Sequence, residues 1–154
     1  MIGVNRLSDR LFELLDGERL KEKQHEAFVL HTVSEDGWPH AAMISAGEII
    51  ALNRTDIRIA LWKNTETAGN ILRTGQAQLT AWWKGAAHYV KLQCEPLPPL
   101  NDAVYDRERF ACRIASAKED VAKYADITSG VRIQLHNAEE VLNRWEATLE
   151  ELKR

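Results

Sequence analysis

The segment from 61 to 70, LWKNTETAGN, brings hydroxyl and amide side chains to the point where a predicted strand gives way to a predicted helix. Thr65 stands at the N-cap position, Thr67 follows two residues later, and Asn70 lies on the next turn. The first amides of a helix have no partner within it, so an N-terminus of this composition can hold a phosphate monoester, helped by the helix dipole. The alternative is that Thr65 only caps the helix, as threonine commonly does.

The common catalytic signatures are missing from the sequence. It contains no GxGxxG, Walker A, HExxH or GxSxG motif and no paired-cysteine metal site, so we do not expect an autonomous hydrolase or kinase. Cys94 and Cys112 lie in alternating segments and are expected to act as small core hydrophobes. The five dispersed histidines are expected to be mainly structural or surface residues; they are His25, His31, His40, His88 and His136.

Composition favours one ordinary domain, spanning residues 1–154, with 45% hydrophobic residues to fill its core. The 20 Lys and Arg are scattered and are outnumbered by 23 Asp and Glu, which argues against a nucleic-acid or anionic-membrane partner. No stretch approaches the ~20 apolar residues that cross a bilayer. We therefore expect a cytoplasmic protein.

Short strands with tight turns dominate the pattern, and helices are predicted at its margins. The predicted helices cover about 9–16, 67–73 and 119–127, with a last amphipathic helix that begins at a capping box formed by Asn137 and Glu140. The predicted strands cover 27–33, a segment opening at Pro39, 48–52, 57–62, 76–84, 86–95, 109–117 and 129–135. The expected fold is α+β but mainly β: an antiparallel split β-barrel of about six to eight strands with peripheral helices.

This order of elements resembles the pyridoxamine 5′-phosphate oxidase-like, FMN-binding split β-barrel family. The resemblance rests on AFVLHTVSEDGWPHAAMIS, a further hairpin, IALWKNTETAGNI and a following strand pair, roughly residues 27–95. It implies FMN as the cofactor and a homodimer whose partner helps to close the flavin site. Trp83, or its neighbour Trp82, is a candidate for that contact because adjacent strand residues face opposite ways.

The resemblance also assigns site residues. The strand that carries Ala42, Met43, Ile44 and Ser45 would lay its backbone along the isoalloxazine ring. Leu61 and Trp62 would flank the ribityl chain. The phosphate would lie at the following loop and helix start, with these residues around it: Lys63, Asn64, Thr65, Thr67 and Asn70.

Two positions depart from the family pattern. Ala42 stands where many members carry Arg, and Thr67 stands where they carry a basic residue in the phosphate loop. A charge-assisted hydrogen bond contributes about 1.5–3 kcal/mol, so some compensation is required, and Lys63 and Arg73 bracket the loop. We therefore expect little oxidation of pyridoxamine 5′-phosphate.

The leading hypothesis is an FMN-dependent oxidoreductase of unspecified substrate, with no named acid or base and a reduced nicotinamide as a candidate electron donor. The alternative is a non-enzymatic split-barrel module or stress-related dimeric protein that binds haem, another ligand or nothing. His31, His40 or His88 would then be the candidate axial ligands.

Overall fold

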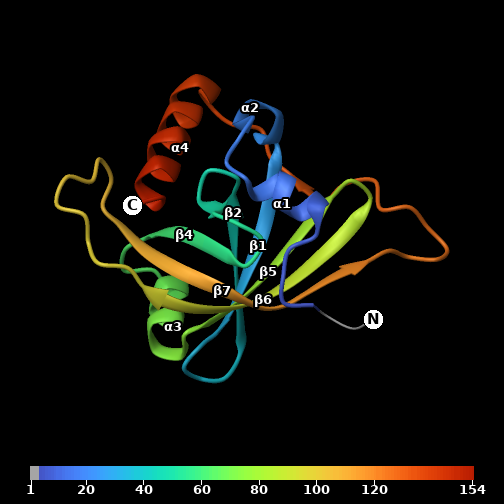
Figure 1. Cartoon of the computed structure of the whole chain (residues 1–154), viewed down its shortest axis with the longest axis horizontal. Helices are drawn as coiled ribbons and strands as arrows, with labels where there is room; N and C mark the ends of the chain where they lie inside the picture. The colour runs from blue at the N-terminus through green and yellow to red at the C-terminus, as the bar shows by residue number, and fades with distance from the viewer. Residues whose placement is uncertain (1–3) are drawn as a thin grey trace.

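The computed structural model describes residues 4–154, which form eight strands and four helices (Figure 1). The strands are β1 (Glu26–Val33), β2 (Pro39–Ser45), β3 (Ile49–Ala51), β4 (Asp56–Trp62), β5 (Gln76–Trp83), β6 (Ala86–Pro96), β7 (Arg107–Asp120) and β8 (Val131–Arg132). The helices are α1 (Asp9–Leu15), α2 (Leu20–Lys23), α3 (Glu66–Thr74) and α4 (Ala138–Leu152).

The strands form one antiparallel sheet in the order β2-β1-β5-β6-β7-β4-β3, with β8 paired to β1. The sheet curls into a half-barrel, as the crossing of β1, β4 and β7 in Figure 1 shows. The predicted fold class is therefore confirmed. β2 and β3 are the two edges of this sheet, and the site described below begins at the β2 edge.

Alternating positions of the central strands fill the core. Phe28, Leu30, Leu79, Val90 and Phe110 are fully buried, as one-sided burial of a curled sheet requires. Helix α4 lies over the β3–β4 part of the sheet and buries Leu149, Leu152 and Trp145. Because Trp145 occupies the space that a Cβ on Gly47 would fill, a glycine is needed there.

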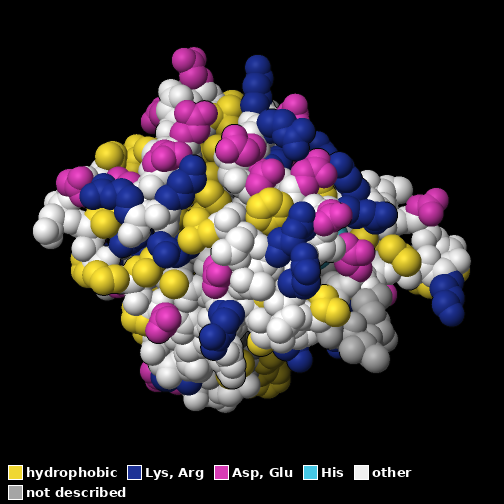
Figure 2. All heavy atoms as spheres, viewed as in Figure 1, with side chains coloured by type: hydrophobic (Ala, Val, Ile, Leu, Met, Phe, Trp, Pro, Cys, Tyr) yellow, Lys and Arg dark blue, Asp and Glu magenta, His cyan; other side chains and the backbone are white. Residues whose placement is uncertain are grey.

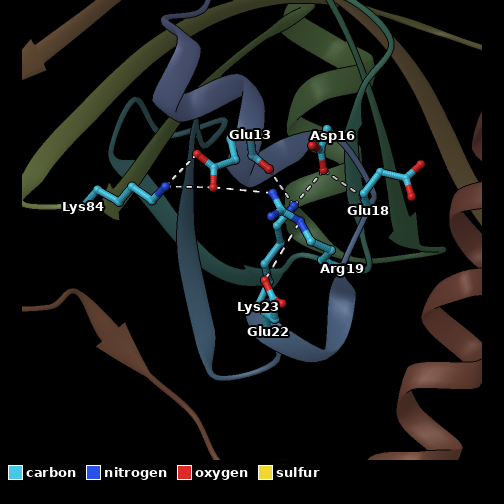
Figure 3. A network of polar contacts seen from close by, with 7 residues as sticks. All are labelled: Glu13, Asp16, Glu18, Arg19, Glu22, Lys23 and Lys84. Atoms are coloured by element: carbon cyan, nitrogen blue, oxygen red, sulfur yellow. Dashed lines mark hydrogen bonds and ion pairs between the residues drawn. The ribbon is translucent and has the colours of Figure 1, made fainter.

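A charged network joins the N-terminal helices to the β5–β6 hairpin (Figure 3). Lys23 is only 2% exposed, and its Nζ donates to the Glu13 carbonyl at 2.5 Å and to Asp16 at 2.7 Å. Lys84, at the hairpin turn, bonds both carboxylate oxygens of Glu13 at 2.8 Å. The buried ammonium is thus paired and hydrogen-bonded, which a buried charge needs.

The predicted elements differ from the structure in the C-terminal third and at α2. The helix predicted at 119–127 is wrong, because β7 continues beside β6 as far as Asp120 and an irregular segment follows. The strand predicted at 129–135 shrinks to the two residues of β8. The capping box is also wrong, since Asn137 has a left-handed backbone and its side chain bonds the Glu140 carboxylate at 2.7 Å. Helix α2 was not predicted.

Lys and Arg side chains lie among Asp and Glu side chains over the face shown in Figure 2. Within the described residues, no helix has both the length and the apolar character that crossing a membrane takes.

Candidate functional site

The free edge of β2 offers backbone groups to a ligand. Ser34 N–H donates to the Trp38 carbonyl at 2.9 Å, and this bond fixes which residues of β2 turn their amides toward β1. By alternation, Ala41, Met43 and Ser45 turn theirs outward. Ser45 confirms the assignment, since its N–H bonds Glu48 at 3.0 Å. Ala41 and Met43 therefore present outward amides and carbonyls on an edge strand.

The four predicted flavin-strand residues lie on both faces of this edge. Ala42 and Ile44 pair with Leu30 and Phe28 and face the core side, whereas Met43 is 61% exposed on the other face. Ser45 is buried, and its hydroxyl donates to Glu48 at 2.8 Å. Burial raises the pKa of Glu48, against the effect of its hydrogen bonds from Ser45.

Helix α3 begins as the sequence predicts, with Thr65 as its N-cap. The Thr65 hydroxyl accepts from Ala68 N–H at 3.2 Å and donates to the Trp62 carbonyl at 3.1 Å, so it is already committed. Asn64 reaches the helix through a left-handed backbone, which asparagine tolerates well. After the cap bond, the amides of Glu66 and Thr67 are the first-turn donors that remain available.

Thr67 is buried and contacts the start of β2. Its Oγ1 lies 3.1 Å from Nε2 of His40, which shares the core-side face of β2 with Ala42. Nδ1 of His40 lies 3.2 Å from Glu66, whose other oxygen accepts from Ser34 at 2.7 Å. The contact joins the predicted phosphate end of the site to the predicted flavin strand. No motif in the sequence indicates that His40 lies at this site.

Asn70 and Arg73 bond the end of β1 and not the residues at the start of α3. Asn70 is buried, and its amide donates to the Thr32 hydroxyl at 3.0 Å. Arg73, in the last turn of α3, donates to the Val33 carbonyl and to Asn70 Oδ1. Its charge therefore lies at the opposite end of α3 from the free amides.

Lys63, Leu61 and Trp62 form the end of β4 and the turn after it. Lys63 pairs with Asp106 at 2.7 Å, and this hydrogen bond raises the pKa of the ammonium. Leu61 is buried, whereas Trp62 is half exposed, with the Arg107 guanidinium stacked 3.6 Å from its ring centre. Neither bracketing cation, Lys63 or Arg73, is thus free at the helix start.

Trp83 lies at the far end of β5, close to α1, and half-buried against the core. Because β5 begins directly after α3, Trp83 stands at the opposite end of that strand from α3. Its neighbour Trp82 packs so closely on the segment at Gly130 that a Cβ there would lie 2.5 Å from the indole.

The three candidate axial histidines lie apart and in different settings. His31 Nε2 is 3.2 Å from the Thr80 hydroxyl, and His40 is bound as described. His88 is 1% exposed, with Nδ1 3.6 Å from Glu119. No group of three or more His, Cys, Asp or Glu side chains in residues 4–154 is placed to hold a metal ion.

The hydrogen-bond donors at the start of α3 have the chemistry that a phosphate needs, but the negative charge of Glu66 lies beside them. The amides of Glu66 and Thr67 lie there beside the Thr67 hydroxyl and the His40 imidazole, which contact each other, while the Glu66 carboxylate contacts the other ring nitrogen of His40. Next to this contact, a hollow of about 370 Å³ is lined by Glu35, Asp36 and Glu66, whose carboxylates would repel an anion.

Solved structures share this fold at low sequence identity. A candidate pyridoxamine 5′-phosphate oxidase from Lactobacillus delbrueckii is 18% identical and superposes over 77% of this chain and 99% of its own, with a TM-score of 0.58. HupZ of Group A Streptococcus is 8% identical over 83% and 99%, with a TM-score of 0.56. An FMN-binding protein from Syntrophomonas wolfei is 16% identical over 70% and 86%, with a TM-score of 0.50.

The fold is therefore that of the pyridoxamine 5′-phosphate oxidase-like split barrels. No protein-family model matches the chain. The uncharacterized protein YclD of Bacillus subtilis (strain 168) is 80% identical over 154 residues, all of both chains, so the chain belongs to the family of YclD.

Proposed function

We propose that the protein binds FMN, with the phosphate at the start of α3 and the isoalloxazine ring along the free edge of β2. The observation that carries the proposal is the contact between Thr67 and His40. It joins two free helix amides, a hydroxyl and an imidazole to the strand whose outward amides have no partner strand. The FMN-binding protein of Syntrophomonas wolfei, which shares the fold, supports the choice of ligand.

His40 supplies the compensation that Ala42 and Thr67 require. It lies two residues before Ala42 on the same face of β2, and its Nε2 already reaches the Thr67 hydroxyl. A bound phosphate would take the place of the contact between Nε2 and Thr67, and an imidazole that donates to it would replace one of the two basic side chains that the family pattern expects. Glu66 would hold the other ring nitrogen and so orient the donor.

The bound flavin would supply electron transfer, and the chain would orient it and control access. Edge amides of Ala41 and Met43 would bond the polar rim of the ring. We propose a reduced nicotinamide as the electron donor. We expect little turnover of pyridoxamine 5′-phosphate, because a second phosphate needs further cations near the ring, and Lys63 and Arg73 are held elsewhere.

A comparison of FMN with riboflavin tests the phosphate site, because the two ligands differ only in the phosphate. Thr67→Val keeps the side-chain shape and removes the hydroxyl, and His40→Ala removes the imidazole. Each should weaken FMN binding by roughly tenfold or more and leave riboflavin affinity unchanged, measured by flavin fluorescence quenching.

Two control variants match these changes outside the site. Thr74→Val removes a hydroxyl that bonds the Asn70 carbonyl at the other end of α3. His31→Ala removes an imidazole from the neighbouring strand β1. Neither should alter the ratio of FMN to riboflavin affinity. The proposal fails if the wild-type protein binds the two ligands equally, or if Thr67→Val and His40→Ala affect both alike.

A further inference from the structure

Cys94 and Cys112 lie directly opposite each other on neighbouring strands. Cys94 belongs to β6 and Cys112 to β7, and the antiparallel register pairs them. Both are free thiols; Cys112 is 3% exposed and Cys94 is half-buried. Any small apolar side chain at these two positions would fill the core. Two thiols that face each other can, in addition, react with each other.

The backbone places this pair at the closer of the two antiparallel spacings. Cys94 N–H donates to the Gly75 carbonyl at 2.7 Å, on the side away from β7. Ile114 N–H donates to the Thr55 carbonyl at 3.1 Å, and Cys112, two residues earlier, turns its amide the same way, toward β4. The cysteines therefore form a non-hydrogen-bonded pair, for which the Cα atoms are about 4.5 Å apart. A disulfide spans Cα separations of about 4.4–6.8 Å.

Both cysteines border an open hollow of about 420 Å³. Its charged wall residues are Arg58, Arg113, Asp56 and Glu95, which alternate with Ile57, Cys94 and Cys112 along the three strands and so lie on the opposite face of the sheet from the two sulfurs. Cys94 is only half-buried, whereas Cys112 is buried, so Cys94 is the more accessible of the two to a small polar oxidant. The hydrogen bond with Cys94, together with burial, raises the pKa of Cys112 well above its ordinary value, so Cys112 stays protonated. Cys94 is thus the sulfur placed to react first.

We propose that Cys94 and Cys112 form a reversible dithiol site that hydrogen peroxide or an organic hydroperoxide oxidises to a cross-strand disulfide. The Cys94 thiolate attacks the peroxide, the O–O bond breaks, and water or an alcohol leaves, giving a sulfenic acid. The Cys112 sulfur then attacks the Cys94 sulfur, the S–OH bond of the sulfenic acid breaks as the S–S bond forms, and the departing hydroxide takes the Cys112 proton and leaves as water. Two thiols are oxidised by two electrons and one peroxide is reduced. The site is independent of the flavin proposal.

The disulfide would hold together the base of the loop between β6 and β7. Beyond it the ladder continues with the pairs Glu95–Ala111 and Pro96–Phe110 and with the bond from Leu97 N–H to the Arg109 carbonyl. The loop they close ends at Arg107, whose guanidinium covers the ring of Trp62. Oxidation would thus fix the strand ends beside the predicted flavin site.

Thiol counting on the full chain tests the proposal. Reduced wild-type protein is treated with an equimolar amount of hydrogen peroxide, and free thiols and intact mass are measured. Both thiols should disappear together, with the loss of two hydrogen atoms in mass and no covalent dimer on a non-reducing gel, and dithiothreitol should restore them. Thiols that persist, a gain of oxygen atoms only, or a link between chains would overturn it.

Two variants separate the roles of the sulfurs. Cys112→Ser should stop the reaction at the Cys94 sulfenic acid, which dimedone labels. Cys94→Ser should leave Cys112 unreacted at the same dose of peroxide. If Cys112 reacts as readily in Cys94→Ser as Cys94 does in Cys112→Ser, the proposed order is wrong. The wild-type measurement remains decisive if either variant fails to fold.

Discussion

A methyl group added at Gly47 would collide with a buried side chain. A Cβ there would lie 1.9 Å from the Trp145 ring, which is itself buried under α4. Gly47→Ala should therefore destabilise the protein by about 1–3 kcal/mol, because the indole must move.

Gly69 offers a matched control in α3, since nothing lies within 4 Å of a Cβ added there. Gly69→Ala should instead stabilise the protein by about 0.5–1 kcal/mol, through helix propensity. Urea unfolding of both variants checks the pair. An equal loss of stability in the two would contradict this account of the packing at Gly47.

His88 should make stability depend on pH in the mildly acidic range. Burial lowers its pKa from the ordinary value of 6.5, with Glu119 opposing that shift and Arg10 adding to it. The unfolded chain therefore takes up the proton first as the pH falls. The contribution of neutral His88 to the free energy of unfolding is fully present above about pH 6.5. It is lost as the pH falls toward the lower pKa that His88 has in the folded protein.

Replacing the imidazole checks this sign. Unfolding free energies of wild type and His88→Gln, measured from pH 8 down through the range below 6.5, should differ in slope, with the wild type losing more stability. Parallel curves would show that His88 titrates alike in both states.

At the scale of elements, the start of α3 depends on one hydroxyl. Thr65 accepts from Ala68 N–H and donates to the Trp62 carbonyl, so it ties the helix to the end of β4. Thr65→Ala should cost about 1 kcal/mol of stability, whereas Thr65→Ser, which keeps the oxygen, should cost much less. Thermal unfolding of the two variants distinguishes them; similar melting temperatures would mean that the cap is dispensable.

Sequence periodicity could predict most strands, α1, α3 and α4, because their burial repeats with period two or with helical spacing. It failed where pairing between strands overrides local preference. Lys118, Glu119 and Asp120 suit a helix, yet their backbones pair with Tyr89, His88 and Ala87 of β6. Helix α2 escaped notice because Lys23, charged in the sequence, is buried through partners that only the fold supplies.

The candidate site could be predicted in part for a similar reason. The cap at Thr65 and the hydroxyl at Thr67 are local signals, readable from LWKNTETAGN. The contact between Thr67 and His40 joins residues 27 positions apart, and it depends on how α3 docks on β2. The same docking directs Arg73 to the Val33 carbonyl, which spacing alone could not reveal.

At the scale of the whole molecule, the β2 edge and its exposed apolar side chains favour a homodimer. Met43 is 61% and Trp38 is 73% exposed, at the strand edge that a partner or a ligand would cover. Light scattering at micromolar concentration should give about twice the 17.5 kDa mass of one chain. A mass equal to one chain would contradict the dimer and, with it, any role for a partner's Trp83.

The visible absorption spectrum of the purified protein shows whether it binds FMN. The protein, freshly purified and then incubated with excess FMN and freed of unbound ligand by gel filtration, should carry the two flavin bands at close to one FMN per chain. A haem spectrum in the fresh protein, or no flavin retained after incubation, would contradict the account.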